Sequence, residues 1–371
     1  MNVAIVTNLP SSYYVDYIDE LSKYVNLTSV FERDYDLHKR APSGIDWTQK
    51  KYKAFFLSKS RSNKENICSL KIIGFLKKHS FDLIIFANPC SPTGILGELF
   101  CKFNRIKYCI QSEGGFVPKK TRIRDIFKKF YMRSACAYLT GMDKENNYFK
   151  KYGATDSTLK KFNFSSLHDS DILKTPICPE EKAAIKMRLG ISFDICIICV
   201  GQFIKRKGID TLINACNGLP KNVCLLIVGG DNVPKDYIEL VHKNQLDKNV
   251  IFVKRIKQSV LKDYYSASDI FILLTREDIW GLVINEAMAF GLPIITTNKS
   301  NAGLQLIENG VNGFIVESDN PILAREKLFE LINDKEKREV MSDNNLKKIR
   351  SYTVEKMGLT IYNYIKELRK K

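Results

Sequence analysis

The sequence predicts an α/β protein with two Rossmann-like domains facing each other across a cleft. Strand-like apolar runs alternate with helical patterns along most of the chain, which is typical of parallel sheets covered by helices. The length of 371 residues is too great for one ordinary core and suits two domains. Between about residues 163 and 180 the periodicity is lost and Ser, Asp and Pro accumulate, which indicates a linker.

Apolar runs and helical spacing define the elements expected in the first half. The strands are expected at NVAIVTN (2–8), FDLIIFAN (81–88), KYCIQ (107–111) and a short run near 138. Helical patterns cover about 15–24, the residues up to about 103, and about 144–151. Each predicted strand is followed by a helix, so a parallel sheet is expected.

The second half repeats this alternation. Strands are expected at 194–203, 223–231, 250–256, 269–275 and 293–297. Helices are expected between them at 208–219, 235–245, 260–268 and 282–290. The end of the chain, 351–371, has a helical pattern with a polar tail.

The composition indicates a soluble globular protein, with 44% apolar and 27% charged residues. The start MNVAIVTNLP is typical of a strand rather than a signal peptide, and no apolar run approaches the ~18 residues of a membrane span. The ten cysteines are scattered, so free thiols in a reducing cytosol are expected. Cys196 and Cys199 form a CxxC inside an apolar strand, and without a second pair they do not predict a zinc site.

The net charge of +17 suits an anionic partner: nucleic acid, an acidic membrane surface or a phosphorylated ligand. Seven basic residues and one acid, Asp125, lie in Lys119–Arg133. The apolar residues of this stretch share one helical face: Ile123, Ile126, Phe127, Phe130 and Tyr131. Two interpretations stay open: a helix that packs this face on its own domain, or a face that lies on anionic lipid. The aromatic residues are not interleaved as a base-stacking surface requires, which argues against nucleic acid.

Ligands bind outside the carboxyl ends of the strands in doubly wound sheets, and two segments of the second half lie there. In VGQFIKRKGIDTL a strand ends near Val200, and Lys207 precedes a helix. A basic side chain beside glycine-flanked backbone can bind an anion there, although the Walker A pattern is absent. In REDIWGLVINEAMAFGLPII the helix begins after Gly281, so the first amides, those of Leu282 and Val283, are free to bind a phosphate.

Glu286 lies in the middle of that second, apolar helix, where a carboxylate is costly unless something pairs with it. It is ~7 Å along the helix axis from Gly281. A phosphate at the helix start would have its attached ribose or sugar within reach, and a carboxylate accepts from two vicinal hydroxyls at once. The alternative is an ion pair with a neighbouring lysine or arginine, and spacing alone leaves both open.

The order of four sequence motifs adds evidence on what this site binds. VGQFIKRKGIDTLINA, LLIVGGD, LKDYYSASDIFILLTRED and EDIWGLVINEAMAFGLPIITT follow one another in the sequence. In this order they resemble the phosphate-lysine segment and the acidic-x7-Glu signature of retaining glycosyltransferases of the GT-B fold, family 4 (glycosyl transferases group 1). The resemblance is strong over Ile195–Val316 and weaker, but visible, in the first half.

The resemblance implies that the two domains bind different substrates. Residues 1–172 would bind the acceptor, and residues 173–352 would bind the nucleotide sugar. A C-terminal helix over 353–371 would pack back on the first domain. No metal would be required.

The resemblance also implies a role for each matching residue. Lys207 holds the donor diphosphate, Glu286 binds the ribose hydroxyls and Asp278 contacts the transferred sugar. Three successive amides bind the distal phosphate: those of Gly281, Leu282 and Val283. Because no protein nucleophile is evident, retention is expected to follow a front-face displacement in which the leaving phosphate oxygen takes the acceptor proton.

The chain departs from the family pattern at three places. Asp278 stands where the family usually has glutamate, so the sugar contact shifts by one methylene or is shared with Glu277. Gln202 stands where the family usually has arginine, and Arg206 can supply the missing cation. Glu113 follows the strand after which the family often carries a histidine. We include Glu113 among the catalytic candidates because it can act on the acceptor or donor, or position them.

The predicted function is transfer of a sugar from a UDP- or GDP-sugar to a glycan or lipid-linked acceptor, without a cofactor. Family members mostly build bacterial surface polysaccharide such as capsule, O-antigen, lipopolysaccharide or exopolysaccharide. A cytoplasmic protein peripheral to the inner face of the membrane is therefore expected.

Two alternatives remain: a sugar-nucleotide epimerase of the same fold, and a non-catalytic basic protein that binds membrane or nucleic acid. An epimerase does not need the basic stretch Lys119–Arg133. In a nucleic-acid binder, Glu286 and Asp278 would repel phosphate.

Overall fold

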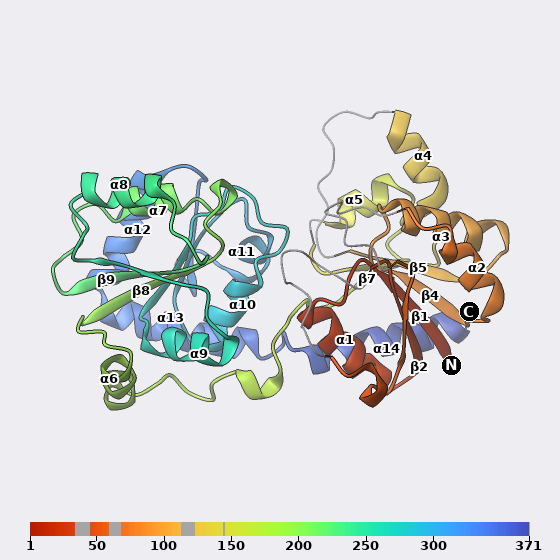
Figure 1. Ribbon diagram of the computed structural model, residues 1–371, viewed down its shortest axis with the longest axis horizontal. Coiled ribbons are helices and arrows are strands. Elements are labelled where there is room, and N and C mark those ends of the chain that lie inside the picture. The colour runs from red at the N-terminus through yellow and green to blue at the C-terminus, as the bar shows by residue number, and fades with distance from the viewer. Residues whose placement is uncertain (34–44, 59–67, 113–122, 144, 371) are drawn as a thin grey trace. The chain divides into compact units, whose positions relative to one another are not determined.

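Two parallel sheets, each flanked by helices, make up the protein (Figure 1). The computed structural model describes residues 1–33, 45–58, 68–112, 123–143 and 145–370. The chain divides into two units: unit 1 is residues 1–166 with 353–371, and unit 2 is residues 167–352. The alternation of strands and helices in the sequence is therefore confirmed as an α/β architecture with two Rossmann-like units. The cleft expected between them stays a prediction.

Unit 1 holds a seven-stranded sheet in the order β3-β2-β1-β4-β5-β6-β7. Its strands are β1 (Asn2–Thr7), β2 (Asn26–Phe31), β3 (Lys53–Phe56), β4 (Leu83–Phe86), β5 (Tyr108–Ser112), β6 (Ala137–Thr140) and β7 (Leu159–Lys161). Its helices are α1 (Ser12–Ser22), α2 (Lys71–Lys78), α3 (Pro92–Phe103), α4 (Ile123–Met132), α5 (Glu145–Lys151) and α14 (Val354–Lys370). The strand order reverses between β1 and β4, where Val3 is paired with Leu83 on one side and with Leu27 on the other.

The last helix of the chain, α14, belongs to unit 1 and packs against α1. The rings of Tyr24 and Tyr362 stack with centroids 4.9 Å apart. The Tyr364 hydroxyl donates to the backbone carbonyl of Lys161 at 2.6 Å. The C-terminal segment thus completes the first unit although the second unit precedes it in sequence.

Unit 2 holds a six-stranded sheet in the order β10-β9-β8-β11-β12-β13. Its strands are β8 (Ile195–Val200), β9 (Val223–Val228), β10 (Val250–Val253), β11 (Ile270–Leu273), β12 (Ile294–Thr297) and β13 (Gly313–Val316). Its α-helices are α6 (Pro179–Arg188), α7 (Ile209–Ala215), α8 (Lys235–Lys243), α9 (Gln258–Ala267), α10 (Leu282–Ala289), α11 (Asn301–Leu306), α12 (Pro321–Asn333) and α13 (Lys335–Ile349). A short 3₁₀ helix, η3 (Lys205–Lys207), precedes α7.

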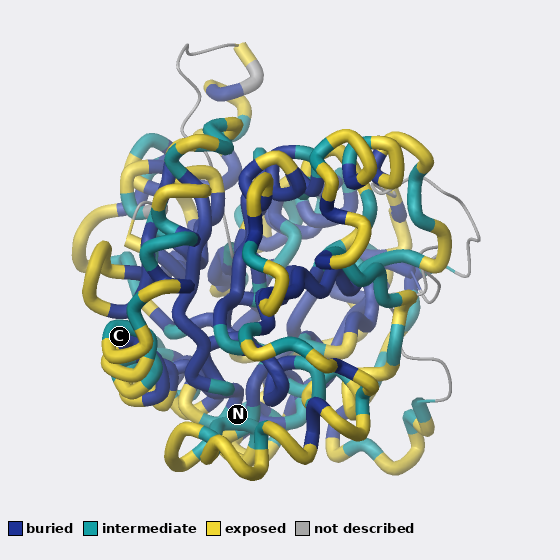
Figure 2. The backbone as a smooth tube through the Cα atoms, turned by 90° about the vertical axis from the view of Figure 1, so that its left-hand side faces the viewer, coloured by how far each residue is buried: buried dark blue, intermediate teal, exposed yellow. Residues whose placement is uncertain are grey.

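Most strands of the two sheets are deeply buried (Figure 2), whereas β3, β7 and β10 are only half-buried or partly exposed. In unit 2, β9 and β11 are buried at every position, as expected for parallel strands covered on both faces. Cys196 and Cys199 lie in this core, and all ten cysteines are free. Among the described helices, none is both long enough and apolar enough to cross a membrane.

Candidate functional site

The candidate site lies in unit 2 at the carboxyl ends of β8 and β11. These strands are neighbours, with Ile197 in register with Ile270, and the strand order reverses between them. In doubly wound sheets this reversal opens a crevice in which ligands bind. The loop after β8 carries Lys207, and the loop after β11 leads to Gly281 and α10.

Gly208 brings the loop after β8 onto the end of β11. Its φ of 65° is left-handed, and a Cβ atom at this position would lie 1.9 Å from the carbonyl oxygen of Leu274. Only glycine tolerates both conditions. Next to it, the carbonyl of Arg206 accepts from the amide of Arg276 at 2.8 Å and from the hydroxyl of Thr275 at 2.9 Å. The two loops are thus joined by two hydrogen bonds to one backbone carbonyl.

Arg276 clamps the same two loops through its side chain. Its guanidinium donates to both carboxylate oxygens of Asp210, at 2.8 and 2.7 Å, and to Asp319 at 2.7 Å. It also donates to the carbonyl of Lys205 at 2.6 Å. Charge-assisted bidentate bonds of this kind fix geometry as well as adding stability. Arg276 was not predicted from the sequence, because spacing does not show that Asp210 and Asp319 contact it.

Lys207 and Asp278 lie on the two loops that Arg276 joins, and they form an ion pair. Nζ of Lys207 lies 2.5 Å from Oδ2 of Asp278, and both side chains are almost buried. Arg206 places Nη1 3.8 Å from Oδ1 of Asp278 and donates to the carbonyl of Glu277 at 2.8 Å. The structure therefore brings together Lys207 and Asp278, which the resemblance assigns to the donor, and Arg206, which was expected to supply the cation missing at Gln202. The Glu277 side chain is exposed.

The start of α10 adjoins this ion pair. Gly281 is left-handed, with φ 100°, and no side chain caps the helix. Across the described part of the chain, no acceptor is recorded for the amides of Leu282 and Val283, whereas Ile284 donates to the carbonyl of Gly281 at 2.9 Å. A Cβ on Gly281 would lie 3.5 Å from Oδ2 of Asp278, so the bare amides and the ion pair are close together. Free amides and the helix dipole favour an anion at this point.

Glu286 lies one turn further along α10 and is half-buried. The Tyr265 hydroxyl donates to its Oε2 at 2.9 Å. Among the residues that the structure describes, Glu286 forms no ion pair, so the lysine or arginine partner left open by the sequence is not found. Burial raises the pKa of the Glu286 carboxyl, and the hydrogen bond from Tyr265 opposes that rise. Tyr265 was not predicted from the sequence, because it lies on a different helix, α9.

Two predicted residues are not among the recorded contacts of this cluster. Gln202 is exposed in the loop after β8, and no described partner is recorded for its side chain. Glu113 falls outside the described residues, so its place in a site stays a prediction.

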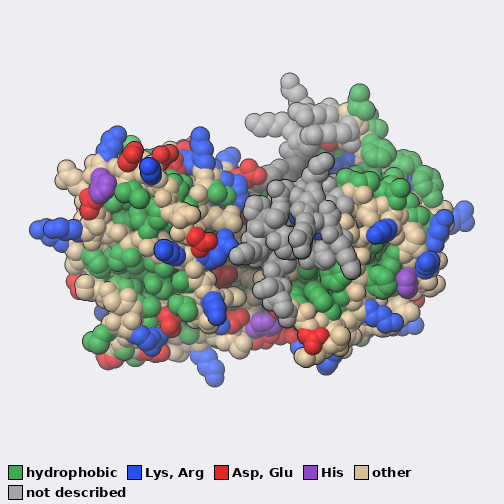
Figure 3. Space-filling model, in the orientation of Figure 1, with side chains coloured by type: hydrophobic (Ala, Val, Ile, Leu, Met, Phe, Trp, Pro, Cys, Tyr) green, Lys and Arg blue, Asp and Glu red, His purple; other side chains and the backbone are tan. Residues whose placement is uncertain are grey.

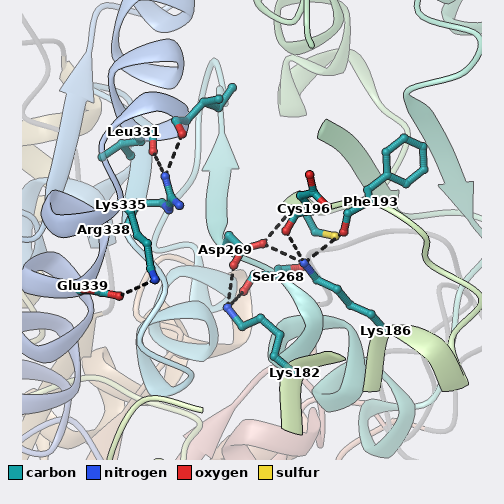
Figure 4. A network of polar contacts seen from close by, with 12 residues as sticks. Lys182, Lys186, Phe193, Cys196, Ser268, Asp269, Leu331, Lys335, Arg338 and Glu339 are labelled. Atoms are coloured by element: carbon teal, nitrogen blue, oxygen red, sulfur yellow. Dashed lines mark hydrogen bonds and ion pairs between the residues drawn. The ribbon is translucent and has the colours of Figure 1, made fainter. Parts of the chain in front are cut away.

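A cavity of about 510 Å³ lies at the opposite, amino-terminal edge of the unit 2 sheet. Figure 4 shows that two lysines of its lining contact Asp269. Asp269 accepts from Lys182 at 2.7 Å, from Lys186 at 3.3 Å and from the amide of Cys196 at 2.9 Å. These contacts link α6 to the starts of β8 and β11 and account for the buried carboxylate without a ligand.

Residues 184–348 match the sequence model of the family described as Glycosyl transferases group 1. Unit 2 carries a glycosyl transferases group 1 domain. The residues of the candidate site all lie within this domain: Lys207, Asp278, the amides after Gly281, and Glu286.

Curated relatives resemble mainly this domain. The capsular polysaccharide biosynthesis glycosyltransferase CapM of Staphylococcus aureus is 32% identical over 158 residues, which cover 40% of each chain. An uncharacterized glycosyltransferase of Haemophilus influenzae is 33% identical over 164 residues, covering 43% of this chain and 46% of the relative. The chain thus spans about half the length of the curated relatives it matches, or less.

Solved structures match both units. A glycosyltransferase of Rickettsia africae covers 100% of this chain, and is covered to 99%, with a TM-score of 0.78 and 16% identity. Anabaena HepE in complex with UDP covers 99% of this chain, and is covered completely (100%), with a TM-score of 0.76 and 16% identity. At such low identity the structural similarity shows the fold alone, and that fold is GT-B.

Proposed function

We propose that the protein is a retaining glycosyltransferase that takes its sugar from a nucleotide-sugar donor held by the glycosyl transferases group 1 domain. One observation carries this proposal. Lys207 and the start of α10 lie at the carboxyl ends of β8 and β11, and Glu286 lies one turn along α10. In the described part of the chain no acceptor is recorded for the amides of Leu282 and Val283. Together they offer binding groups for a diphosphate and for an attached pair of vicinal hydroxyls.

In this proposal each group binds one part of the donor. Lys207 and Arg206 neutralise the diphosphate, and the amides at the start of α10 hold its distal phosphate. Glu286 accepts hydrogen bonds from the ribose hydroxyls. Asp278 pairs with Lys207 at 2.5 Å. When the diphosphate binds Lys207 in its place, Asp278 contacts the transferred sugar.

Transfer then depends on positioning and on charge stabilisation. The acceptor hydroxyl attacks from the face that the diphosphate leaves, and the leaving phosphate oxygen takes the acceptor proton. The bond from the anomeric carbon to the diphosphate breaks as the bond to the acceptor oxygen forms. Lys207, Arg206 and the helix amides stabilise the negative charge that develops on the diphosphate. We propose that no metal is needed, so transfer should survive chelation of divalent ions.

The acceptor is proposed to be a glycan or a lipid-linked oligosaccharide of bacterial surface polysaccharide. The names of relatives support this class. CapM, which is 32% identical over its matched part, is named for capsular polysaccharide biosynthesis. A Mycobacterium tuberculosis relative, 25% identical over 173 residues, is named as a GDP-mannose-dependent mannosyltransferase of a phosphatidylinositol mannoside. Both UDP- and GDP-sugars are therefore donors to test.

We further propose that α4 attaches unit 1 to the inner face of the cytoplasmic membrane. Its polar side packs on its own unit: Asp125 is buried and accepts from the Tyr152 hydroxyl at 2.9 Å. Lys128 donates to Cys90 Sγ at 3.0 Å and to the Tyr148 hydroxyl. Lys128 is therefore not a free surface charge, which corrects its expected part in the basic face of Lys119–Arg133.

The apolar side of α4 faces solvent instead of packing on the domain. The exposed fractions are 87% for Ile123, 68% for Ile126, 50% for Phe127 and 39% for Phe130. Tyr131, expected on the same face, is 3% exposed and packs inward. Apolar side chains gather on the surface where α3 and α4 lie (Figure 3, upper right). The interpretation in which this apolar face packs on its own domain is therefore not supported for these four residues.

Charge on the same surface favours an anionic bilayer as the partner of α4. Lys129 and Arg133 are exposed on α4 or just after it, and the chain carries a net charge of +17. Lys102 lies over the ring of Phe130, 3.4 Å from its centroid, beside Phe103, which is 72% exposed. Exposed apolar side chains bordered by cations suit the boundary between headgroups and acyl chains. Residues 119–122 of the basic stretch lie outside the described residues.

The donor proposal is tested by thermal unfolding of the whole protein with a panel of nucleoside diphosphates and nucleotide sugars. One nucleotide family should raise the unfolding midpoint in a concentration-dependent way, because a ligand that binds the native state stabilises it. Lys207→Ala should abolish this rise, whereas Lys205→Ala, which alters an exposed neighbour, should keep it. A panel without effect on the wild-type protein would contradict the proposal.

A further inference from the structure

Tyr265 lies at the centre of the contacts that hold Glu286. It belongs to α9, and its side chain is almost completely buried. Its hydroxyl donates to Oε2 of Glu286 at 2.9 Å, across from α9 to α10. A buried phenol needs a hydrogen-bond partner, and a carboxylate inside an apolar helix needs a donor, so each group satisfies the other.

Packing fixes the direction in which the Tyr265 hydroxyl points. Its ring stacks on Phe290, with centroids 5.5 Å apart and planes at 19°. Phe271 of β11 lies against the ring with a centroid distance of 6.3 Å. The packed ring therefore fixes the position of the hydroxyl, and its hydrogen bond fixes the position of Oε2 of Glu286.

The hydrogen bond uses only one of the two carboxylate oxygens. For Oε1 of Glu286 no partner is recorded among the residues described. Because Tyr265 holds Oε2, Oε1 can accept a hydrogen bond from ribose in a fixed direction. A fixed carboxylate loses less conformational entropy when the ligand binds.

The same contact bears on the charge of Glu286. Burial raises the pKa of Glu286, the hydrogen bond from Tyr265 lowers it, and the negative charge of Asp171 raises it. Asp171 is itself paired with Lys262 at 2.6 Å. No other charged group is recorded as acting on Glu286 in the described part of unit 2.

We propose that Tyr265 is a positioning residue of the donor site, whose hydroxyl orients Glu286 toward the ribose hydroxyls. The inference rests on the proposed nucleotide-sugar site and adds to it a residue on another helix. Tyr265 touches neither the donor nor the reacting atoms. It acts through Glu286 alone.

The test compares Tyr265→Phe with Tyr264→Phe, since Phe keeps the buried ring and removes only the hydroxyl. Tyr264 is the neighbouring, half-buried tyrosine of the same helix. Calorimetric affinities are measured for UDP and GDP and for their 2′,3′-dideoxy forms. Wild-type protein should prefer the ribose form by about tenfold or more, as expected for a hydrogen bond to a charged acceptor. Tyr265→Phe should lose most of this preference without weakening the dideoxy form, and Tyr264→Phe should keep it.

A pH series gives a readout that loss of packing would not produce. Binding of the ribose form needs an ionised Glu286, so affinity falls as the pH drops through its pKa. Without the hydroxyl that pKa rises further, and the fall should begin at higher pH in Tyr265→Phe. In a Glu286→Gln background, Tyr265→Phe should change neither the ribose preference nor the pH series.

The outcomes separate this inference from the function on which it rests. A wild-type protein that binds no nucleoside diphosphate contradicts both. A wild-type protein that prefers ribose, with Tyr265→Phe showing the same preference and the same pH series, contradicts the role of Tyr265 alone. If Tyr265→Phe does not fold, Phe290→Leu supplies the test, because loosening the stacked ring should lower the ribose preference in part. An unchanged preference in that variant would also contradict the inference.

Discussion

Nζ of Lys207 and Oδ2 of Asp278 lie 2.5 Å apart, between two loops that Arg276 clamps together. The lysine proposed for the diphosphate is thus paired with the acid proposed for the sugar. A diphosphate that binds Lys207 must compete with this carboxylate. We therefore expect the pair to affect both how tightly the donor binds and where its sugar lies.

Asp278→Asn removes the competitor of the diphosphate. Nucleoside diphosphates should then bind more tightly, by about tenfold. Asparagine carries no charge, so the positive charge of Lys207 is available to the diphosphate. Turnover should fall at the same time, since the sugar loses its carboxylate. Calorimetry and a transfer assay measure the two effects, and Glu239→Gln, at an exposed acid of α8, serves as the control. Weaker nucleotide binding in Asp278→Asn would show that the carboxylate does not oppose the phosphate.

Arg276→Lys should separate the two loops without changing the net charge. A lysine cannot keep the two bonds to Asp210 and the further bond to Asp319 in one plane. We expect the KM for the donor to rise about tenfold, because Lys207 and the α10 amides lose their fixed spacing. Arg255→Lys, at an exposed arginine of unit 2, should leave KM unchanged. Equal KM values for both variants would remove Arg276 from the account.

Glu32 gives unit 1 a pH-dependent stability. Its side chain is fully buried after β2 and accepts from Ser91 at 2.5 Å and Asn88 at 3.2 Å. Burial raises its pKa from 4.5 to about 7. Between these pH values the unfolded carboxyl ionises while the folded one stays neutral, so stability falls as the pH rises. The loss amounts to roughly 3 kcal/mol when complete.

Glu32→Gln does not titrate and should escape this loss. Its unfolding midpoint, relative to the wild-type protein, should therefore be higher at pH 8 than at pH 4.5. Thermal unfolding at the two pH values, with Glu308→Gln as an exposed control, checks this. A difference between variant and wild type that does not change with pH would contradict the assignment.

The exposed apolar face of α4 predicts salt-sensitive membrane binding. Wild-type protein should sediment with anionic vesicles and not with neutral ones, and less so at high ionic strength. Replacing Ile123, Ile126 and Phe127 by serine should release it. Replacing Met187 and Val340 by serine is the matched control, because these apolar side chains of unit 2 are also exposed, at 83% and 55%. Equal binding to neutral and anionic vesicles would reject the proposed partner.

The alternation of elements was predictable because apolar periodicity reports burial directly. The strands β8, β9 and β11 are long runs of apolar residues and were predicted close to their observed bounds. The strands β2 and β3 were not assigned. β2 interleaves Asn26, Thr28 and Ser29 with apolar residues, and β3 begins at Lys53 and is only partly buried, so neither gives a clear pattern.

The site was predictable only in part. Lys207 and the start of α10 follow strand ends, so the topology of the sheet brings them together. Contacts between distant segments are not visible in spacing, which is why the partners of Arg276 and the bond from Tyr265 to Glu286 appear only in the structure. Periodicity likewise shows that the apolar residues of α4 share a face. It does not show that Asp125 and Lys128 anchor the opposite face to the domain.

The central claim is that the glycosyl transferases group 1 domain binds a nucleotide sugar through Lys207 and Glu286 and that the protein transfers the sugar. The most direct test incubates purified protein with the labelled donor found by the thermal panel, together with lipid-linked glycan acceptors. Wild-type protein should form a labelled product with the anomeric configuration of the donor, and Glu286→Gln should form it at least about a hundredfold more slowly while remaining folded. A Glu286→Gln variant that transfers at the wild-type rate, or a wild-type product of inverted configuration, would contradict the account.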